Sequence, residues 1–186
     1  MPWVSPTNVA TGDVLTAATW NQDVVENTSV LRALTNVQQT FLTGTNGVAN
    51  STTYVDVNDG TANLAVTITP TYSTSKILVT VHLYVGVSAG TQVSARLLRG
   101  STVIGGGVTA SNRQGVFAAI YSEDSGRNES LDYTYLDSPA TTSATTYKVQ
   151  LNCPSATVYV NRSGSDGDLT NQFRGACNII AREIPV

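Results

Sequence analysis

Two glycines and a serine near the middle of the chain match a motif of serine hydrolases. Gly86, Ser88 and Gly90 fit the G-x-S-x-G pattern of the nucleophile elbow, which requires a helix after the serine and a histidine later in the chain. Residues 91–98 instead alternate as a strand does, and the only histidine, His82, precedes the motif. The sequence therefore predicts a glycine-rich hairpin here and no catalytic serine.

A second glycine-rich stretch, residues 105–110, fits the looser G-x-G-x-x-A form of the dinucleotide-binding motif. That motif needs an amphipathic helix directly after it, because the helix N-terminus binds the pyrophosphate. Residues 111–115 read Ser-Asn-Arg-Gln-Gly and offer no apolar face for such a helix. We predict a loop between two strands and no bound cofactor.

Candidate metal ligands and catalytic carboxylates are few. Asp166 and Asp168 flank a glycine and could offer oxygen ligands to calcium, but the closing glutamate of an EF-hand loop is missing. A solvated turn is the alternative. Glycoside hydrolysis needs two carboxylates across a cleft, and no pair stands out among the acids at strand ends and turns, which are Asp56, Asp59, Asp132 and Asp137. We predict no catalytic or metal-binding residue.

The chain contains two cysteines, Cys153 and Cys177, which are too few for a disulfide framework. A single bridge could join them if the strands that they border are neighbours. The alternative, which we favour, is two reduced cysteines that pack as small hydrophobic side chains.

Tyrosine is the one enriched residue type that suggests binding, with eight in the chain. By the two-residue period of a strand, Tyr133 and Tyr135 share a face with Leu131, while Tyr159 points opposite to its valine neighbours. Exposed tyrosines can stack on sugars or anchor a protein interface, but tyrosine is also common in strands. These three tyrosines are candidate ligand-binding or subunit-interface residues.

The composition limits the partners. Charged residues make up 12% of the chain, and 10 Lys plus Arg against 13 Asp plus Glu give a formal charge of −3. No Lys/Arg cluster occurs, which argues against nucleic acid as a partner. No stretch approaches the ~20 apolar residues that cross a bilayer, and the start does not fit a secretory signal. We expect a soluble protein made in a cytoplasm.

The longest apolar run, residues 73–86, predicts the central strand of the fold. One face of it is entirely apolar and comprises Ile77, Val79, Val81, Leu83 and Val85. Such a strand belongs in a sheet that packs on a second sheet. About ten strand signals recur from residue 53 onward, broken by turn residues. The predicted fold is mainly β, an antiparallel jelly-roll-like β-sandwich over residues 53–186.

Three segments precede the predicted sandwich. Residues 1–15 show no periodicity and predict an extended arm, whose Trp3 needs a pocket on this domain or on a partner. Residues 16–42 predict a short α-helix that forms a neck, and residues 43–52 a polar linker. The apolar face of the helix recurs every three to four residues and comprises Trp20, Val24, Asn27, Leu31 and Leu34.

Two arrangements of this helix remain open. It could lie singly on the sandwich, or it could pair with copies of itself in a short multi-chain stalk. A polar Asn27 at a core position suits the stalk, because buried asparagine specifies register and oligomeric state.

Two sets of residues resemble bacteriophage structural proteins. Trp3-Val4-Ser5-Pro6, followed by Thr11-Gly12-Asp13-Val14-Leu15-Thr16-Ala17-Ala18 and Trp20-Asn21, resembles the N-terminal attachment segments of tailed-phage structural proteins. Most of the remaining chain is similar to a domain of phage tail-fibre and head-fibre proteins, whose strand pattern is like that of the trimeric C1q and tumour-necrosis-factor jelly rolls. The matching stretches are Ser51 to Val55, Ser75 to Val79, Leu97 to Gly100, Tyr135 to Pro139 and Ile180 to Ile184.

This resemblance implies a non-enzymatic virion structural protein, a fibre or decoration component assembled in the host cytoplasm. It implies a homotrimer with the helix as neck, the arm held by other virion proteins and the sandwich as an outward knob. It brings no binding residue to this chain. One alternative is a module that binds carbohydrate or a host receptor, such as a host-surface glycan, through loops 105–115 or 123–129. A further alternative is a polysaccharide-degrading enzyme.

Overall fold

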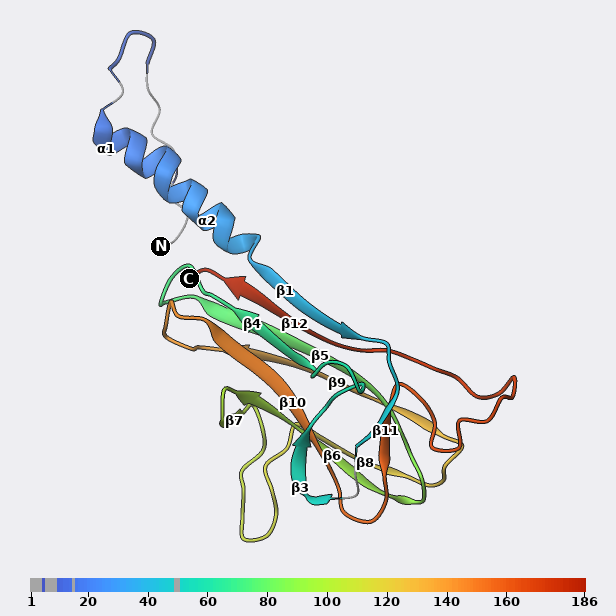
Figure 1. Cartoon of the computed structure of the whole chain (residues 1–186). Helices are drawn as coiled ribbons and strands as arrows, with labels where there is room; N and C mark the ends of the chain where they lie inside the picture. Colours follow the sequence, from blue (N-terminus) through green and yellow to red (C-terminus); the bar gives the residue numbers. More distant parts are fainter. Residues whose placement is uncertain (1–4, 6–9, 15, 49–50) are drawn as a thin grey trace.

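The chain folds as a sandwich of two six-stranded antiparallel sheets, in a computed structural model that describes residues 5, 10–14, 16–48 and 51–186 (Figure 1). Sheet A contains β1 (Val37–Leu42), β2 (Asn46–Val48), β5 (Lys76–Val87), β9 (Asn128–Asp137), β11 (Val158–Val160) and β12 (Cys177–Ile184). Sheet B contains β3 (Ser51–Asp56), β4 (Ala65–Ile68), β6 (Thr91–Arg99), β7 (Thr102–Ile104), β8 (Ala118–Ser122) and β10 (Thr145–Cys153). The predicted fold class is confirmed.

Strand β5 is the centre of sheet A. Strand β9 pairs with it along one edge from Ile77 to Gly86. The other edge is shared, because β12 pairs with its first half and β11 with its last residues. The five side chains predicted to face the core are fully buried. Each such burial contributes about 1.5–3 kcal/mol, so this strand forms a large part of the core.

Strand β10 has the same place in sheet B, where β6 pairs along one edge and β3 and β4 share the other. Its inward side chains Tyr147, Val149 and Leu151 are fully buried, and the residues between them face outward. The two sheets thus pack their apolar faces on one another, while each leaves an outer face for other contacts.

A buried polar contact ties the end of β9 in sheet A to sheet B. The Asp137 carboxylate, almost fully buried, accepts two hydrogen bonds from Nη1 of Arg99 at 3.0 and 2.9 Å. It also accepts the Tyr147 hydroxyl at 2.7 Å. Burial and this bond to Asp137 raise the pKa of Tyr147. Asp137 therefore joins the two sheets by a charged contact in the core.

One continuous helix precedes the sheets and is built of α1 (Ala17–Trp20), η1 (Asn21–Glu26) and α2 (Asn27–Leu34), of which η1 is a π-helical segment. Thr16 caps its start, because its Oγ1 accepts the main-chain N–H of Thr19 at 3.1 Å. The helix projects from one end of the sandwich in line with β1 (Figure 1). Among the described helices, none combines the length and apolar character that a bilayer-spanning segment requires.

The helix is shorter than predicted. The neck was expected to run through residue 42 and the linker from 43 to 52, but the helix ends at Leu34 and β1 and β2 occupy 37–42 and 46–48. These strands pair with β12 and β11, which lie more than a hundred residues later. A pattern of neighbouring residues cannot show such long-range partners, and the Gln-rich start of β1 has no strand alternation of its own.

Both cysteines are buried free thiols, as we favoured from the sequence. Burial raises the pKa of Cys177 to about 11, so its reactive thiolate is scarce at neutral pH. We expect no reaction of the native protein with Ellman's reagent on the minutes scale, and two reactive thiols per chain in urea without reductant. A disulfide would instead leave the unfolded chain unreactive until reductant is added.

Candidate functional site

Four of the five residues predicted for the apolar face of the helix are exposed in the single chain. The exposed fractions are 50% for Trp20, 39% for Val24, 50% for Leu31 and 47% for Leu34. Trp3 lies outside the described residues. These four side chains are therefore only partly covered within the single chain, although their spacing in the sequence is that of a helix that packs on another helix.

Asn27 differs from the other four because it is buried, with 3% exposed. Its side-chain amide donates to the main-chain carbonyl of Asp23 at 3.3 Å. The π-helical segment that ends at Glu26 changes the angular spacing of the side chains before Asn27. The structure therefore does not bring Asn27 onto the exposed face that it was predicted to share.

Exposed apolar side chains continue along the chain from the helix into β1. Val37 follows the helix closely and is 41% exposed, and Phe41 on the same side of β1 is 57% exposed. We call the combined surface the helix–β1 surface; it comprises Trp20, Val24, Val25, Leu31, Leu34, Val37 and Phe41. It holds seven of the fifteen exposed large apolar side chains in the described part of the chain, within 22 residues. Such a concentration marks an interaction surface.

Two of the candidate ligand-binding tyrosines are partly buried and pack against the core. The rings of Phe117 and Tyr133 stack with centroids 4.6 Å apart, and Tyr135 stacks beyond Tyr133 at 6.2 Å. The Tyr133 hydroxyl donates to the carbonyl of Gly105, and burial raises its pKa. Tyr133 and Tyr135 therefore support the glycine-rich loop and the core.

Tyr159, the third candidate, lies on the outer face of sheet A in β11. The Arg162 guanidinium lies 3.8 Å from the centroid of its ring, and Gly47 of β2 is packed against the ring edge. The ring is thus held by neighbours within the chain, and one of its faces is covered by a cation. It does not lie near Tyr133 or Tyr135 in the strand order, because β5 separates their strands.

The outer face of sheet B carries a connected row of polar side chains that sequence reasoning did not identify. Asp56 accepts Nζ of Lys148 at 2.9 Å and Nε2 of Gln150 at 2.6 Å. Burial opposes the charge of Asp56, but these two bonds outweigh it and lower its pKa. Gln150 in turn accepts Arg96 at 2.7 and 2.9 Å. We call this row, together with Tyr54 and Ser94, the polar ladder.

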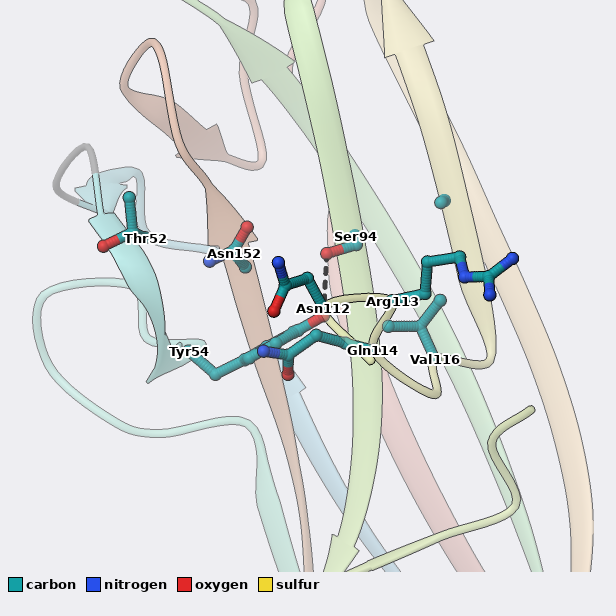
Figure 2. Close-up of a pocket in the computed structure, with 9 residues that line it drawn as sticks. Thr52, Tyr54, Ser94, Asn112, Arg113, Gln114, Val116 and Asn152 are labelled. Carbon is teal, nitrogen blue, oxygen red and sulfur yellow. Dashed lines mark hydrogen bonds between the residues drawn. The ribbon is translucent and has the colours of Figure 1, made fainter. Parts of the chain in front are cut away.

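The ladder ends at a pocket. The Arg96 guanidinium stacks 4.0 Å from the centroid of the Tyr54 ring, and the Tyr54 hydroxyl shares a 2.9 Å hydrogen bond with Oγ of Ser94 (Figure 2). These two side chains line a surface pocket of about 410 Å³. Its other lining residues are Thr52, Asn112, Arg113, Gln114, Val116, Ala119 and Asn152.

The rim of the pocket comes from the loop between β7 and β8, residues 105–117, which the sequence predicted to be a loop between strands. The loop is a narrow hairpin with bonds across it, from Gly107 N to Val116 O at 3.2 Å and reciprocally between Ala110 and Arg113 at 3.0 Å. A Cβ on Gly115 would lie 2.0 Å from the Gly107 carbonyl oxygen. The glycines therefore permit close approach of two chain segments, a role unrelated to a pyrophosphate.

The remaining candidate residues, Ser88, His82 and Asp166, each contact other residues of the chain. Ser88 lies in the turn between β5 and β6, as predicted, and its Oγ accepts the main-chain N–H of Thr157 at 3.0 Å. Nδ1 of His82 lies 2.5 Å from Asp132 on the outer face of sheet A, an exposed pair. The carboxylate of Asp166 lies 2.8 Å from Arg174 and 3.8 Å from Arg162. Asp166 is thus paired with two cations.

No family model matches this chain, and no curated protein matches it. Among solved structures, it is similar to a chain in the structure of the Gx strain of infectious bursal disease virus, with 14% sequence identity and a TM-score of 0.35. The match covers 78% of this chain and 37% of that chain. This chain thus corresponds to little more than a third of the length of that neighbour.

Proposed function

We propose that the chain is a non-enzymatic structural protein of a bacteriophage virion, a fibre or decoration component that assembles as a homotrimer through the helix–β1 surface. The observation that carries the proposal is the exposure of this surface in the single chain. A helix of this length is marginal in water without packing partners. A projecting helix with an uncovered apolar face therefore needs a partner to be stable.

Copies of the same chain are the partner that fits this surface. Leu31 and Leu34, which follow the π-helical segment, keep the three-residue α-helical spacing by which identical helices pack in parallel. Since the helix and β1 lie in one line (Figure 1), helices that meet along this face would also bring their β1 strands together. In this arrangement the first turn of the helix lies at the end of the neck away from the sandwich, and other virion proteins would bind the arm that precedes it in the sequence.

Light scattering on the full chain tests the assembly. We expect a mass three times the 19.6 kDa of one chain. The double substitution L31E/L34E should reduce it to that of a monomer with a folded sandwich, because each buried leucine contributes about 1.5–3 kcal/mol and a charge in the seam is repelled. Val108, exposed on the β7–β8 loop, provides the control: V108E should remain trimeric.

A wild-type monomer, or an unchanged mass for L31E/L34E, would refute assembly through this surface. The virion role has its own test, which is the detection of the chain by mass spectrometry in purified particles of the phage that encodes it. Absence of the chain from those particles would overturn the virion assignment and leave the assembly result unaffected.

A further inference from the structure

We propose that the pocket between loop 105–117 and the outer face of sheet B binds an uncharged, hydroxyl-rich saccharide unit. The pocket encloses about 410 Å³, within the range of small-molecule sites in proteins. It lies on sheet B, away from the helix–β1 surface, so ligand binding and self-association can be tested separately.

The groups that face the pocket match sugar hydroxyls. Figure 2 shows the side chains of Asn112 and Gln114 reaching over the Tyr54 ring from the loop, while Thr52 and Asn152 come from the neighbouring strands. Amides and hydroxyls can each donate and accept hydrogen bonds, as a sugar hydroxyl does. The amides of Asn112 and Gln114 make no hydrogen bond with any described residue, so they are available to a ligand.

The charged groups around the pocket are held by neighbouring residues or point away from it, and Arg113 is the one charged side chain among the described lining residues, which favours a neutral ligand. Arg96 is held by Gln150 and the Tyr54 ring. The carboxylate of Asp56 is paired with Lys148. Arg113 points away from Tyr54, opposite to Asn112 and Gln114 (Figure 2), and its Nε donates to the carbonyl of Ala110. Because the guanidinium of Arg113 points away and Arg96 lies behind the Tyr54 ring, an anionic ligand would lose hydration without a direct contact to a cation of the lining.

The pocket also offers apolar surface and a fixed shape. The Tyr54 ring, Val116 and Ala119 line it and could contact the C–H face of a pyranose ring. Arg96 and Ser94 hold the Tyr54 ring in place. The cross-braced hairpin holds Asn112 and Gln114 above it. Such preorganisation lowers the entropic cost of binding.

Protein-detected NMR with simple glycosides tests the proposal. The probes are the methyl glycosides of glucose, galactose, mannose and N-acetylglucosamine, together with the matched uronic acids. We expect saturable shifts of amide signals from residues 52–54 and 112–116 with at least one neutral glycoside, at millimolar affinity. The uronic acid of the same sugar should bind at least about tenfold more weakly.

Variants connect the signal to the pocket. N112A/Q114A should weaken the affinity at least about tenfold. Neither side chain makes a contact that the fold requires, so the spectrum of the rest of the protein should be unchanged. N171A, which removes an exposed amide from the loop before β12, should bind as the wild type does. The proposal is overturned if no neutral glycoside gives saturable shifts, if the double variant binds normally, or if the uronic acid binds as well as its neutral counterpart.

Discussion

Replacing Asp137 with alanine should lower the free energy of unfolding by about 3 kcal/mol, because it breaks a buried charge pair and leaves a buried hydroxyl without a partner. Asp137 accepts both Arg99 and Tyr147 at the junction of the two sheets. Its side chain is 6% exposed, whereas that of Arg99 is 32% exposed. Arg99 can regain some hydration in the variant. The loss in the free energy of unfolding should therefore lie at the lower end of the range of about 3–5 kcal/mol observed when a buried ion pair is broken.

Asp132 provides the matched control for this prediction. It lies on the same strand, and its carboxylate is paired with His82, but 67% of its side chain is exposed. D132A should therefore change stability by less than about 1 kcal/mol. Both variants are compared by urea unfolding at one fixed chain concentration, since assembly adds to the apparent stability. A D137A protein as stable as D132A would contradict the assignment of Asp137 as the tie between the sheets.

A double-mutant cycle separates the two partners of Asp137. Y147F alone should cost about 1 kcal/mol, since it removes one hydrogen bond to a buried carboxylate. In the D137A background the same substitution should cost nothing or restore stability, because it removes the hydroxyl that D137A leaves unpaired. Equal effects in the two backgrounds would mean that the hydroxyl and the carboxylate act independently.

The core of this fold was predictable from sequence because it obeys a short-range rule. Alternation along 77–85 identifies the buried face of β5, and that strand alone implies a second sheet to cover it. β1 was missed for the opposite reason. Its register comes from β12, at the other end of the chain, and two of its exposed residues, Val37 and Phe41, are apolar where a lone strand would show polar ones. These two side chains extend the proposed assembly surface beyond the helix.

The candidate site was only partly predictable. Loop 105–115 could be named as a possible ligand loop because its glycines and polar residues have no core role. Tyr54, Ser94 and Asn152 come from three strands, and each is the ordinary polar outward residue of its own strand. Only the pairing of β10 with β3 and β6 brings them together. The amides and hydroxyls at alternate positions of these strands could have indicated a binding site, but the same pattern is typical of any sheet face that is exposed to solvent.

Substitution of Glu183, at the base of the helix, is the second change for which we expect a large loss of stability. Its carboxylate is fully buried and accepts Nδ2 of Asn36 at 2.7 Å and the N–H and hydroxyl of Thr71 at 2.8 and 3.0 Å. Asn36 lies between the helix and β1, and its carbonyl accepts the main-chain N–H of Glu183 at 3.0 Å. This carboxylate therefore fixes the point from which the neck leaves the sandwich. E183Q places an amide N–H against these donors and should cost about 2–3 kcal/mol at pH 7.

The pH dependence of stability gives this prediction a sign. Burial opposes the charge of Glu183, but the hydrogen bonds from Asn36 and Thr71 outweigh it and lower the pKa from 4.5. Because the pKa of Glu183 is lower in the folded protein than in the unfolded chain, its contribution to the free energy of unfolding is complete at a pH above the unfolded-state pKa. This contribution is lost as the pH falls through the folded-state pKa. Wild-type stability should therefore fall below about pH 5, and E183Q should fall less steeply. It should retain the smaller slope due to Asp56, whose pKa is also lowered.

Urea unfolding between pH 7 and pH 3 measures both effects, with E123Q as the control. Glu123 is 70% exposed and pairs with Arg127 across a surface loop, so its loss should leave the curve of stability against pH unchanged. If the curves of wild type and E183Q ran parallel through the acid range, Glu183 would not be charged in the folded protein. If E183Q were as stable as the wild type at pH 7, the base of the neck would be held by the pairing of β1 with β12 alone.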